Sequence, residues 1–470
     1  MCSFDKRHTL IILAALSLAG YALLPLFFPL LSQYYHAPLR DIRFFAPSPW
    51  GGLAYASMFL LLYAIYARAY QHVNRQGAGA SFILGATVLF SLPLLLTYPI
   101  NATDVFRYFI RGRVTGFYGE SALMVPPSEF SQDPYLPLAG EWAGETSPYG
   151  PFWELVAAGV TVVSGQNLFL SLLIFKALGI VAHSSIGLII WKALETRSGH
   201  YRAAMTLLWS WNPALLFMFA VDGHNDALMM LWLVLGFVVM GRHPLPGYLI
   251  AVLGALTKPI GALALPLLFL GHWRRLERWS ARWRFLLFVA IGTTILSLAA
   301  FAPFGSLFDL ALRLLTEASE AAGFSPGVVV VLVAQRLALP VETGTMIEAV
   351  TLIGFALFAL ITLWIAWRGM RVTLSIAAVF GSYLITAMTF RIWYSAWPFV
   401  WLIFDEGRRM RSLTVAVWFL FTAHLSILIY GHLRVHALSG DQLIAHLIGV
   451  PFTFLLPILL ARRFPFVSER

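Results

Sequence analysis

The amino-acid sequence predicts an all-α integral membrane protein that crosses the bilayer many times. Of its 470 residues, 59% are hydrophobic and only 11% are charged, whereas a soluble domain carries about 25% charged residues. The mean hydropathy is +0.78. Apolar runs near twenty residues long recur along the whole chain, which is the length a helix needs to cross a bilayer. A β-barrel is disfavoured, because its strands alternate polar and apolar residues over about ten positions.

The apolar segments give about 12–14 expected transmembrane helices. They lie near 9–31, 51–70, 81–100, 151–164, 168–191, 203–221, 225–240, 246–271, 284–303, 326–340, 345–368, 372–390, 392–406, 412–431 and 442–461. Lys6 and Arg7 precede the first segment, which is longer than the apolar core of a signal peptide, so we expect an uncleaved anchor. No separate soluble domain or internal repeat is visible, and a single membrane domain over 1–470 is expected.

Charged residues are sorted along the chain, and this sorting predicts the orientation. Basic residues gather in alternate loops, and acidic residues gather in the others. The basic loops lie near 68–75, 192–202, 274–284, 368–371, 408–411 and 462–470, and acids collect in 101–150, 222–226 and 317–320. Because basic loops stay in the cytoplasm, both termini are predicted to be cytoplasmic, in a plasma membrane. The net charge of +10 therefore reflects topology, and no nucleic-acid partner is expected.

Three apolar segments conflict with a simple alternation of sides. The charge count predicts that segments 151–164 and 326–340 begin and end outside, and that 246–271 begins and ends inside. Lys258 and Pro259 stand at the middle of 246–271, and each half is shorter than a crossing at about 1.5 Å per residue. One interpretation is a pair of short helices with Lys258 at an outer apex. The other is one long tilted helix with a proline kink and a miscounted neighbour.

The first polar constellation opens the long outer loop 101–150. Asp104, Arg107 and Tyr108 share one helix face at spacings of three and four residues, and Arg111 extends it. A carboxylate beside cations stays ionised and can accept a proton from a sugar hydroxyl, and the arginines can hold a phosphate. The alternative is a helix-capping Asp with surface arginines.

Aromatic residues crowd the stretch 133–153 between prolines and glycines. They include Tyr135, Trp142, Tyr149 and Trp153. Aromatic faces at a membrane surface suit sugar rings, and they also form the ordinary interfacial belt. Tyr135 and Tyr149 are therefore candidates for substrate contact, with the belt as the alternative.

A short acidic turn lies between two apolar segments on the predicted outer side. Asp222, His224 and Asp226 fall within five residues, with Asn225 among them. They could bind a divalent cation or orient a substrate hydroxyl. The alternative is a polar turn in which Asn225 or Asp226 caps the next helix.

Lys258 is one of only four lysines, and it lies inside an apolar segment. Cations within a membrane usually face a cavity or a partner, and a lipid phosphate is a natural partner for this one. The alternative is snorkelling to the interface. We favour the functional interpretation.

The last constellation is FRIWYSAWP at 390–398, which the charge count places outside. Arg391 could clamp a phosphate, and Trp393 and Tyr394 could line a groove. The alternative is an interfacial aromatic anchor.

Several site classes are disfavoured. Cys2 is the only cysteine, so neither an internal disulfide nor a cysteine metal site is expected. The sequence contains no nucleotide-binding phosphate loop, no HExxH zinc signature and no GxSxG elbow.

The ordered set of motifs resembles a known family. Asp104 and Tyr108 form a D-x-x-x-Y pattern, followed by DPY at 133–135 and SPYGP at 147–151; GHNDA then begins at 223, TKP at 257 and WYSAWP at 393. This order resembles the polyprenol-phosphate-mannose-dependent α-mannosyltransferases of the GT-C superfamily, and most closely the bacterial α-1,6-mannosyltransferases of lipoglycan assembly. The resemblance covers about 95 to 405.

The resemblance implies a GT-C fold with short or re-entrant helices around an outward-facing cavity. It also implies that Asp104, in the first large extracytoplasmic loop 101–150, is the catalytic carboxylate. Two apolar segments precede the Asp-bearing one, where many members have only one, and no second acid is adjacent to Asp104. The second departure leaves metal dependence open, so no cofactor is certain and a divalent cation, Mg²⁺ or Mn²⁺, remains an option.

The implied reaction moves a sugar, mannose by family default, from a polyprenyl-phosphate donor to a glycan or glycolipid hydroxyl on the extracytoplasmic face. Asp104 would act as general base, with inversion. The leaving phosphate would be stabilised by four cationic side chains, those of Lys258, Arg391, Arg107 and Arg111. Membrane lipids complete the expected partners. A transporter or flippase of lipid-linked sugars is the main alternative, and a non-catalytic scaffold is a third.

Overall fold

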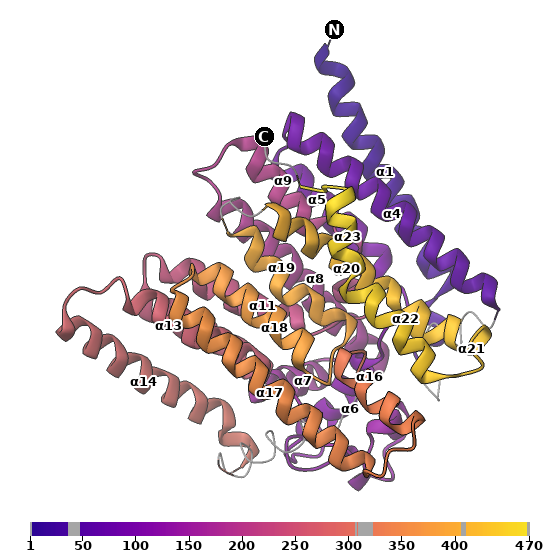
Figure 1. The fold of residues 1–470 in the computed structure, drawn as a ribbon, viewed down its shortest axis with the longest axis vertical. Helices are drawn as coiled ribbons and strands as arrows, with labels where there is room; N and C mark the ends of the chain where they lie inside the picture. Colours follow the sequence, from indigo (N-terminus) through magenta and orange to yellow (C-terminus); the bar gives the residue numbers. More distant parts are fainter. Residues whose placement is uncertain (1, 36–47, 306–307, 309–322, 406–409, 468–470) are drawn as a thin grey trace. The chain divides into compact units, whose positions relative to one another are not determined.

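The fold is described from a computed structural model of the chain (Figure 1). It describes residues 2–35, 48–305, 308, 323–405 and 410–467, with side chains from residue 8 onward. Within these ranges the regular elements are all helices, so the predicted all-α fold class is confirmed. The predicted acidic stretch 317–320 and basic residues 408–409 lie outside the described residues.

The chain divides into two compact units. Unit 1 comprises Met1–Phe45 and Met58–Arg313, and unit 2 comprises Ala46–Ser57 and Leu314–Arg470. The expectation of a single membrane domain over 1–470 stays a prediction. The candidate catalytic loop lies entirely in unit 1, whereas the segment around Arg391 lies in unit 2.

Unit 1 holds most of the helices. In chain order they are α1 (Cys2–Phe27), α2 (Leu30–Gln33), α4 (Pro49–Gln76, of which the residues up to Ser57 belong to unit 2), α5 (Ala80–Leu95), α6 (Asp104–Gly116), η1 (Pro127–Glu129), η2 (Leu136–Trp142), α7 (Pro151–Val163), α8 (Leu168–Ala193), α9 (Gly199–Ser210), α10 (Pro213–Leu216), η3 (Phe217–Val221), α11 (Asp226–Met240), α12 (Pro244–Thr257), η4 (Pro259–Ala264), α13 (Leu265–Trp273), α14 (Trp279–Phe301) and η5 (Ala302–Phe304). The helices α6 and α7 pack together, as do α11 and α12, and α8 packs against α9 and α11.

Unit 2 contains the remaining helices. They are α16 (Pro326–Arg336), α17 (Thr343–Arg368), α18 (Val372–Thr386), η6 (Ile392–Ser395), α19 (Ala396–Ile403), α20 (Met410–Leu428), η7 (Ile429–Leu433), α21 (Arg434–His436), α22 (Gln442–Phe454) and α23 (Leu456–Arg463). The helix α18 packs between α17 and α19, and α20 packs against α22 and α23.

Seven helices in the described part of the chain are long and apolar enough to cross a bilayer. They are His8–Phe27, Pro49–Gln76, Leu168–Ala193, Trp279–Phe304, Thr343–Arg368, Met410–His436 and Gln442–Arg463. A bent pair, Gly199–Ser210 with Pro213–Val221, would add an eighth. A polytopic membrane protein is therefore confirmed, whereas the count of 12–14 crossings depends on the shorter apolar helices and stays a prediction.

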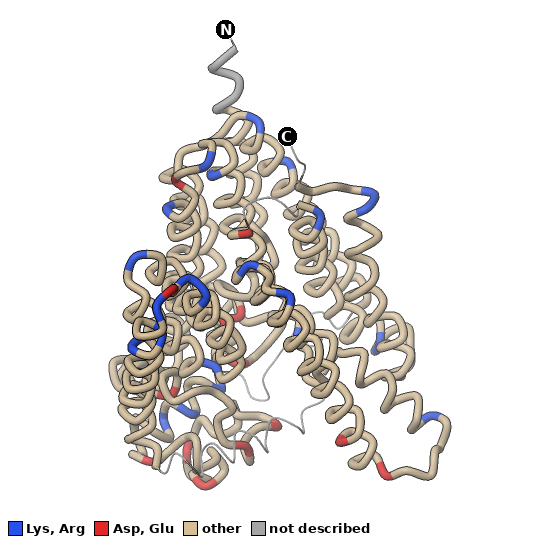
Figure 2. The backbone as a smooth tube through the Cα atoms, turned by 60° about the vertical axis from the view of Figure 1, so that its left-hand side comes forward, with Lys and Arg blue, Asp and Glu red and all other residues tan. Residues whose placement is uncertain are grey.

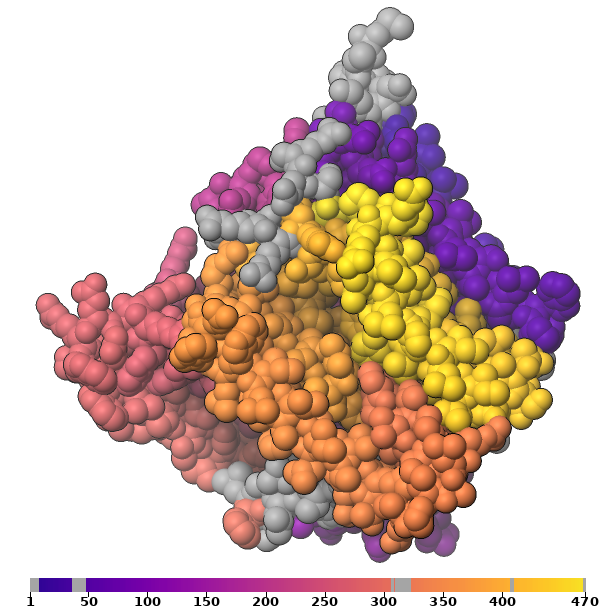
Figure 3. Space-filling model, in the orientation of Figure 1, coloured from indigo at the N-terminus to yellow at the C-terminus, as the bar shows by residue number. Residues whose placement is uncertain are grey.

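The long helices carry apolar side chains on their outer surfaces. Helix α17 lies on the face seen in Figure 3, and Phe355, Leu363 and Trp367 are among its exposed side chains. Lys and Arg, in contrast, concentrate at the ends of helices and in the turns between them (Figure 2). This distribution suits helices whose middles contact lipid and whose ends reach water.

The segments that conflicted with the alternation of sides form short helices. Helix α7 has 13 residues and α16 has 11, which at 1.5 Å per residue is well short of a hydrocarbon core of about 30 Å. The segment 246–271 is broken at Lys258, whose backbone is extended at φ −146° and ψ 122°. Pro259 explains the break, because the residue before a proline is driven out of the helical region. Two short helices are therefore confirmed here, and the single kinked helix is wrong.

Candidate functional site

The site is built around the first turn of α6. Helix α6 begins at Asp104, and Arg107 lies one turn along it. The Nη1 atom of Arg107 donates to Oδ1 of Asp104 at 2.9 Å. Asp104 is 6% exposed, so the carboxylate is nearly buried beside a cation. The predicted shared helix face is present, and the carboxylate bonds to Arg107.

The turn 222–226 approaches Asp104 from a distant part of the chain. A single π-helical turn, η3, ends at Val221, and such turns shift the register of a helix and often occur at functional sites. Gly223 then takes a positive φ of 70°, which favours glycine. This brings Nδ1 of His224 to 3.5 Å from Oδ2 of Asp104.

The side chain of Asp222 faces the chain segment that leads into α6. One carboxylate oxygen accepts hydrogen bonds from the backbone N–H groups of Ile100 (2.9 Å) and Asn101 (3.1 Å). The other oxygen accepts from Nδ2 of Asn101 at 2.9 Å. Asp222 is 1% exposed. Its carboxylate is therefore occupied by the chain segment that leads into α6.

The hypothesis of a divalent cation on this turn finds no support in the geometry. Asp222 faces Asn101, His224 faces Asp104, and Asp226 faces Lys258. Across the residues that the structure describes, no group of three or more His, Cys, Asp or Glu side chains is placed to hold a metal ion. The three residues are close in sequence, but their side chains contact different segments of the chain and do not meet at one point.

Lys258 reaches the same region from the break after α12. Its Nζ atom lies 3.0 and 2.9 Å from the two carboxylate oxygens of Asp226, and its side chain is 12% exposed. The ammonium group also lies 5.8 Å from the ring centre of Tyr149. Lys258 therefore has both an acidic partner and an aromatic neighbour.

Tyr149 has two cationic side chains near its ring. The guanidinium of Arg111 is 5.9 Å from the ring centre, and the Lys258 ammonium is 5.8 Å from it. Arg111 also donates to the backbone carbonyls of Thr146 (3.1 Å) and Glu145 (3.5 Å). Arg111 therefore holds the loop that carries Tyr149, which is a structural role beyond the predicted phosphate contact.

Tyr108 and Asn225 join these segments. The backbone N–H of Asn225 donates to the Tyr108 hydroxyl at 3.4 Å. The Tyr108 ring packs edge-on against Tyr149 at 5.3 Å and Trp153 at 4.7 Å. Four motifs that are far apart in sequence therefore meet in unit 1: the start of α6, the turn 222–226, the SPYGP stretch and Lys258.

Tyr135 belongs to a different cluster within the loop. The guanidinium of Arg113 lies 5.0 Å from its ring centre, and Arg113 donates from Nε to Asp133 at 2.8 Å. The Tyr135 ring packs edge-on against Phe109. These contacts stabilise the fold of the loop, and a substrate contact of Tyr135 stays a prediction.

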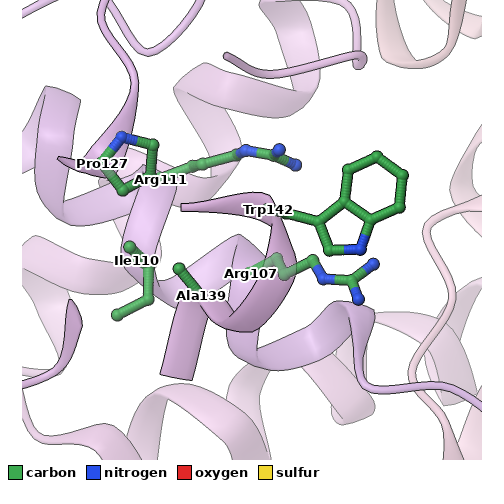
Figure 4. Close-up of a pocket in the computed structure, with 6 residues that line it drawn as sticks. All are labelled: Arg107, Ile110, Arg111, Pro127, Ala139 and Trp142. Atoms are coloured by element: carbon green, nitrogen blue, oxygen red, sulfur yellow. The ribbon is translucent and has the colours of Figure 1, made fainter. Parts of the chain in front are cut away.

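A small hollow opens beside the first turns of α6. Figure 4 shows Arg107 running alongside the indole of Trp142, and their separation is 5.0 Å from guanidinium to ring centre. The space is lined by Arg107, Ile110, Arg111, Pro127, Ala139 and Trp142, and it is too narrow to hold a water molecule. It is therefore a packing gap beside α6 and does not itself indicate a ligand site.

The aromatic segment after Arg391 forms its own cluster in unit 2. The guanidinium of Arg391 lies 5.8 Å from the ring centre of Phe324. The Tyr394 ring stacks on Trp397 at 4.1 Å and meets Trp393 edge-on at 5.8 Å. Because these residues belong to unit 2 and Asp104 to unit 1, their joint participation in one site stays a prediction.

Burial sets the protonation of two groups on the turn. Burial lowers the pKa of His224 to about 4, although Asp104 and Asp226 oppose the shift, so the imidazole is neutral near pH 7. Burial raises the pKa of Asp222 to about 7, and the hydrogen bonds from Asn101 and Ile100 together with the charge of Lys176 oppose it.

Sequence reasoning missed two polar residues that position this site. Asn101 bonds to Asp222, and Ser147 donates from its hydroxyl to Glu154 at 2.5 Å while accepting from the backbone N–H of Tyr149. Both residues lie within motifs described above, at 101–113 and 147–151. Their partners, Asp222 and Glu154, lie outside those motifs, and the local sequence does not identify such pairs.

Comparison with known proteins places the chain among membrane sugar transferases. Residues 9–274 match the family model described as alpha-(1->6)-mannopyranosyltransferase, N-terminal domain. The matched range includes α6, the turn 222–226 and Lys258, and it covers more than half of the chain.

Individual relatives are distant. Alpha-(1->6)-mannopyranosyltransferase A of Mycobacterium tuberculosis is 25% identical over 343 residues, which is 68% of this chain and 65% of that protein. A protein of Mycolicibacterium smegmatis named as a probable alpha-(1->6)-mannopyranosyltransferase is 24% identical over 47% of this chain and 37% of its own length. Alpha-(1->6)-mannopyranosyltransferase A of Corynebacterium glutamicum is 26% identical over 37% of this chain and 36% of its own length. The aligned part thus spans less than two thirds of each relative.

Proposed function

Because the chain belongs to the alpha-(1->6)-mannopyranosyltransferase family, whose N-terminal domain model matches residues 9–274, we propose that it is a membrane mannosyltransferase. Its proposed donor is a polyprenyl-phosphate mannose, and its proposed acceptor is a hydroxyl of a glycan or glycolipid. The polytopic fold, with seven long apolar helices among the described residues, suits a donor with a lipid tail.

The observation that carries the proposal is the setting of Asp104. Its carboxylate bonds to Arg107 at 2.9 Å and lies 3.5 Å from the imidazole of His224. A carboxylate within hydrogen-bond reach of a cation and close to an imidazole suits the role of a general base. Lys258 reaches the same cluster through Tyr149 and Asp226.

The proposed reaction is a single displacement. Asp104 takes the proton of the acceptor hydroxyl, and the oxygen attacks the anomeric carbon of the donor. The new glycosidic C–O bond forms as the bond between that carbon and the phosphate oxygen breaks, so the anomeric configuration inverts. The phosphate leaves with the electron pair on its lipid carrier, and Lys258, Arg107 and Arg391 are proposed to stabilise the charge that develops there.

The proposed location of the chemistry is the extracytoplasmic face of the plasma membrane, with both termini in the cytoplasm. The sorting of charged residues along the chain supports this location. The described basic runs at 192–202 and 274–284 fall at one set of helix ends along the chain, and the acid-rich loop 101–150 falls at the other. A donor carried by a lipid instead of a nucleotide suits a compartment without nucleotide sugars.

The direct test is mannosyl transfer by the purified full-length chain. Incubation with radiolabelled polyprenyl-phosphate mannose and a short mannan should yield labelled glycan. Asp104→Asn should remove transfer while leaving donor binding intact, because the amide cannot accept the proton. Glu120→Gln, an exposed carboxylate in the same loop, is the matched control and should retain activity.

Two outcomes would contradict the proposal. Near-normal turnover of the Asp104→Asn variant would remove Asp104 as the base. Movement of the lipid-linked sugar across vesicles without any glycan product would favour a transporter or flippase instead.

A further inference from the structure

We propose that Asp222 is a positioning residue that fixes the chain segment leading into Asp104, instead of a contact to substrate or metal. This inference deepens the proposed function and rests on it for its kinetic consequence. The contacts between the turn 222–226 and the segment 97–103, called the clamp below, do not depend on that function.

The clamp consists of three hydrogen bonds to one carboxylate. Two come from successive backbone N–H groups, those of Ile100 and Asn101, and the third comes from the Asn101 side-chain amide. The three bonds engage both carboxylate oxygens, so the side chain of Asp222 holds the backbone and the side chain of the other segment at once. Asp222 thereby holds residues 100 and 101, which precede it in the sequence by 122 and 121 positions.

The start of α6 depends on this outside support. Thr103 occupies the N-cap position but its side chain makes no capping hydrogen bond. Only Ala102 and Thr103 separate the clamped Asn101 from Asp104. A helix terminus without its own side-chain cap has unsatisfied N–H groups and tends to fray. The clamp limits that fraying at the point where Asp104 must hold its position.

The turn that supplies Asp222 is itself tightly held. The backbone N–H of Asp222 donates to the carbonyl of Phe217 at 2.9 Å, across the π-helical turn. At Gly223 a Cβ atom would lie 3.2 Å from Cγ of Lys176 and 3.4 Å from Cγ2 of Val105, so the turn packs closely on α8 and on α6. Lys176 in turn donates from Nζ to the carbonyl of Thr97. The segment before Asp104 is therefore held at Thr97 as well as at residues 100 and 101.

The same turn also reaches Asp104 directly. His224, two residues after Asp222, places Nδ1 3.5 Å from Oδ2 of Asp104. The turn thus fixes the backbone before Asp104 through Asp222 and approaches its carboxylate through His224. Since Asp222 is 1% exposed and both of its oxygens already accept hydrogen bonds, we assign it to positioning.

An acid–amide exchange tests the clamp. In the Asp222→Asn variant, one acceptor oxygen replaces two for the three N–H donors, so the contact to residues 100 and 101 is weakened. The double variant Asn101→Asp with Asp222→Asn restores one carboxylate and one amide in reversed order. We expect Asp222→Asn to lower kcat for mannosyl transfer at least tenfold while donor KM changes less than threefold, and the exchanged double variant to recover kcat to within threefold of the natural protein.

Amide hydrogen exchange of residues 97–104 gives a readout that does not need activity. Asp222→Asn should accelerate exchange of this segment, and the exchanged double variant should restore its protection. If the natural protein makes no mannosylated product, the proposed function fails while this measurement still decides the clamp. Unchanged exchange in Asp222→Asn, or a double variant as impaired as the single one, would overturn the inference.

Two further variants separate positioning from general stability. Asn101→Ala removes only the side-chain bond to Asp222 and replaces Asp222→Asn as the test if that variant does not fold. It should accelerate amide exchange of residues 97–104 and lower kcat by less than Asp222→Asn does. Asp133→Asn is the matched control, since Asp133 is also buried and accepts from Arg113, Tyr118 and Tyr135. It should lower the melting temperature without accelerating exchange of 97–104, and acceleration there would count against a local clamp.

Discussion

At the scale of single residues, the main feature is that the buried charges of the candidate site come in pairs. Asp104 bonds to Arg107, and Asp226 bonds to Lys258. A buried charge that loses its partner costs several kcal/mol, whereas removing both partners is often nearly neutral. This difference allows the role of Lys258 in chemistry to be separated from its role in folding.

Replacing Lys258 with Met should destabilise the protein and remove activity. The side chain of Asp226 is 0% exposed, so loss of its cation should cost about 3–5 kcal/mol. The double variant Asp226→Asn with Lys258→Met should recover most of the stability but no mannosyl transfer. Thermal unfolding in detergent and product formation measure the two effects. Normal turnover of the double variant would show that the ammonium has no part in the reaction.

The neutral state of His224 predicts a pH dependence of stability. Its pKa is lowered by burial to about 4, against about 6.5 in an unfolded chain. The unfolded state therefore binds more protons between these values, and stability should fall as the pH decreases from about 6.5 towards 4. The loss should be smaller in His224→Gln. Melting temperatures of both proteins between pH 7.5 and 5 are the measurement, and parallel curves would contradict a neutral buried imidazole.

The sequence predicted contacts within one helix turn better than contacts between distant segments. The spacing of Asp104 and Arg107 on one helix face was enough to predict their contact, because both belong to one turn. The bond between Asp222 and Asn101 joins positions more than a hundred residues apart. Nothing in either local sequence specifies that pairing, so the sequence offers only a substrate or metal contact for Asp222, with a polar turn as the alternative.

At the scale of elements, close backbone contacts decide how the site segments meet. The backbone N–H of Gly150 donates to the carbonyl of Thr257, the residue before Lys258. A Cβ atom on Gly150 would lie only 2.1 Å from the carbonyl oxygen of Leu256. The SPYGP stretch therefore needs glycine here in order to pack on the end of α12.

Substituting Gly150 with Ala should push the loop away from α12. We expect a loss of about 1–3 kcal/mol, which is typical of overpacking, together with reduced transfer because Tyr149 and Lys258 separate. Gly144→Ala is the matched control in the same loop, since a Cβ there meets nothing within 4 Å. Denaturant titration and activity assays of both variants provide the comparison. Equal stability of the two variants would contradict this contact.

Local chemistry explains which element boundaries could be predicted. The break at Lys258 follows from Pro259, and it is visible in the sequence. The π-helical turn η3 has no such signal, because Phe217–Val221 is an ordinary apolar stretch. Its geometry depends on the packing of neighbouring helices, such as α8, which a single sequence does not specify.

At the scale of the whole molecule, charge sorting makes a prediction about sidedness. Cys2 is the only cysteine, so a Cys2→Ser background allows single reporters to be introduced. Ser128→Cys in the loop 101–150 should react with a membrane-impermeant maleimide added to intact cells. Arg275→Cys, between α13 and α14, should react only after the membrane is opened. Both positions are exposed; the reverse pattern would invert the topology and place the chemistry in the cytoplasm.

The sequence predicts a membrane protein reliably because this conclusion depends on the composition of the entire chain and not on the contacts of single residues. An 11% share of charged residues is too small for a soluble protein of this length, and the helices confirm that conclusion. The division into two units was not predictable. It depends on which helices pack together, and the apolar surfaces of α17 and α14 differ little in sequence from those of packed helices.

The bond between Asn101 and Asp222 has a consequence for covalent modification. Asn101, Ala102 and Thr103 spell the tripeptide at which oligosaccharyltransferases attach glycans to asparagine. The nitrogen that would receive the glycan already donates to a buried carboxylate at 2.9 Å. An N-linked glycan at this position would therefore have to be added before the surrounding helices assemble. A glycan found on Asn101 in the mature protein would show that the hydrogen bond to Asp222 had not formed in that molecule.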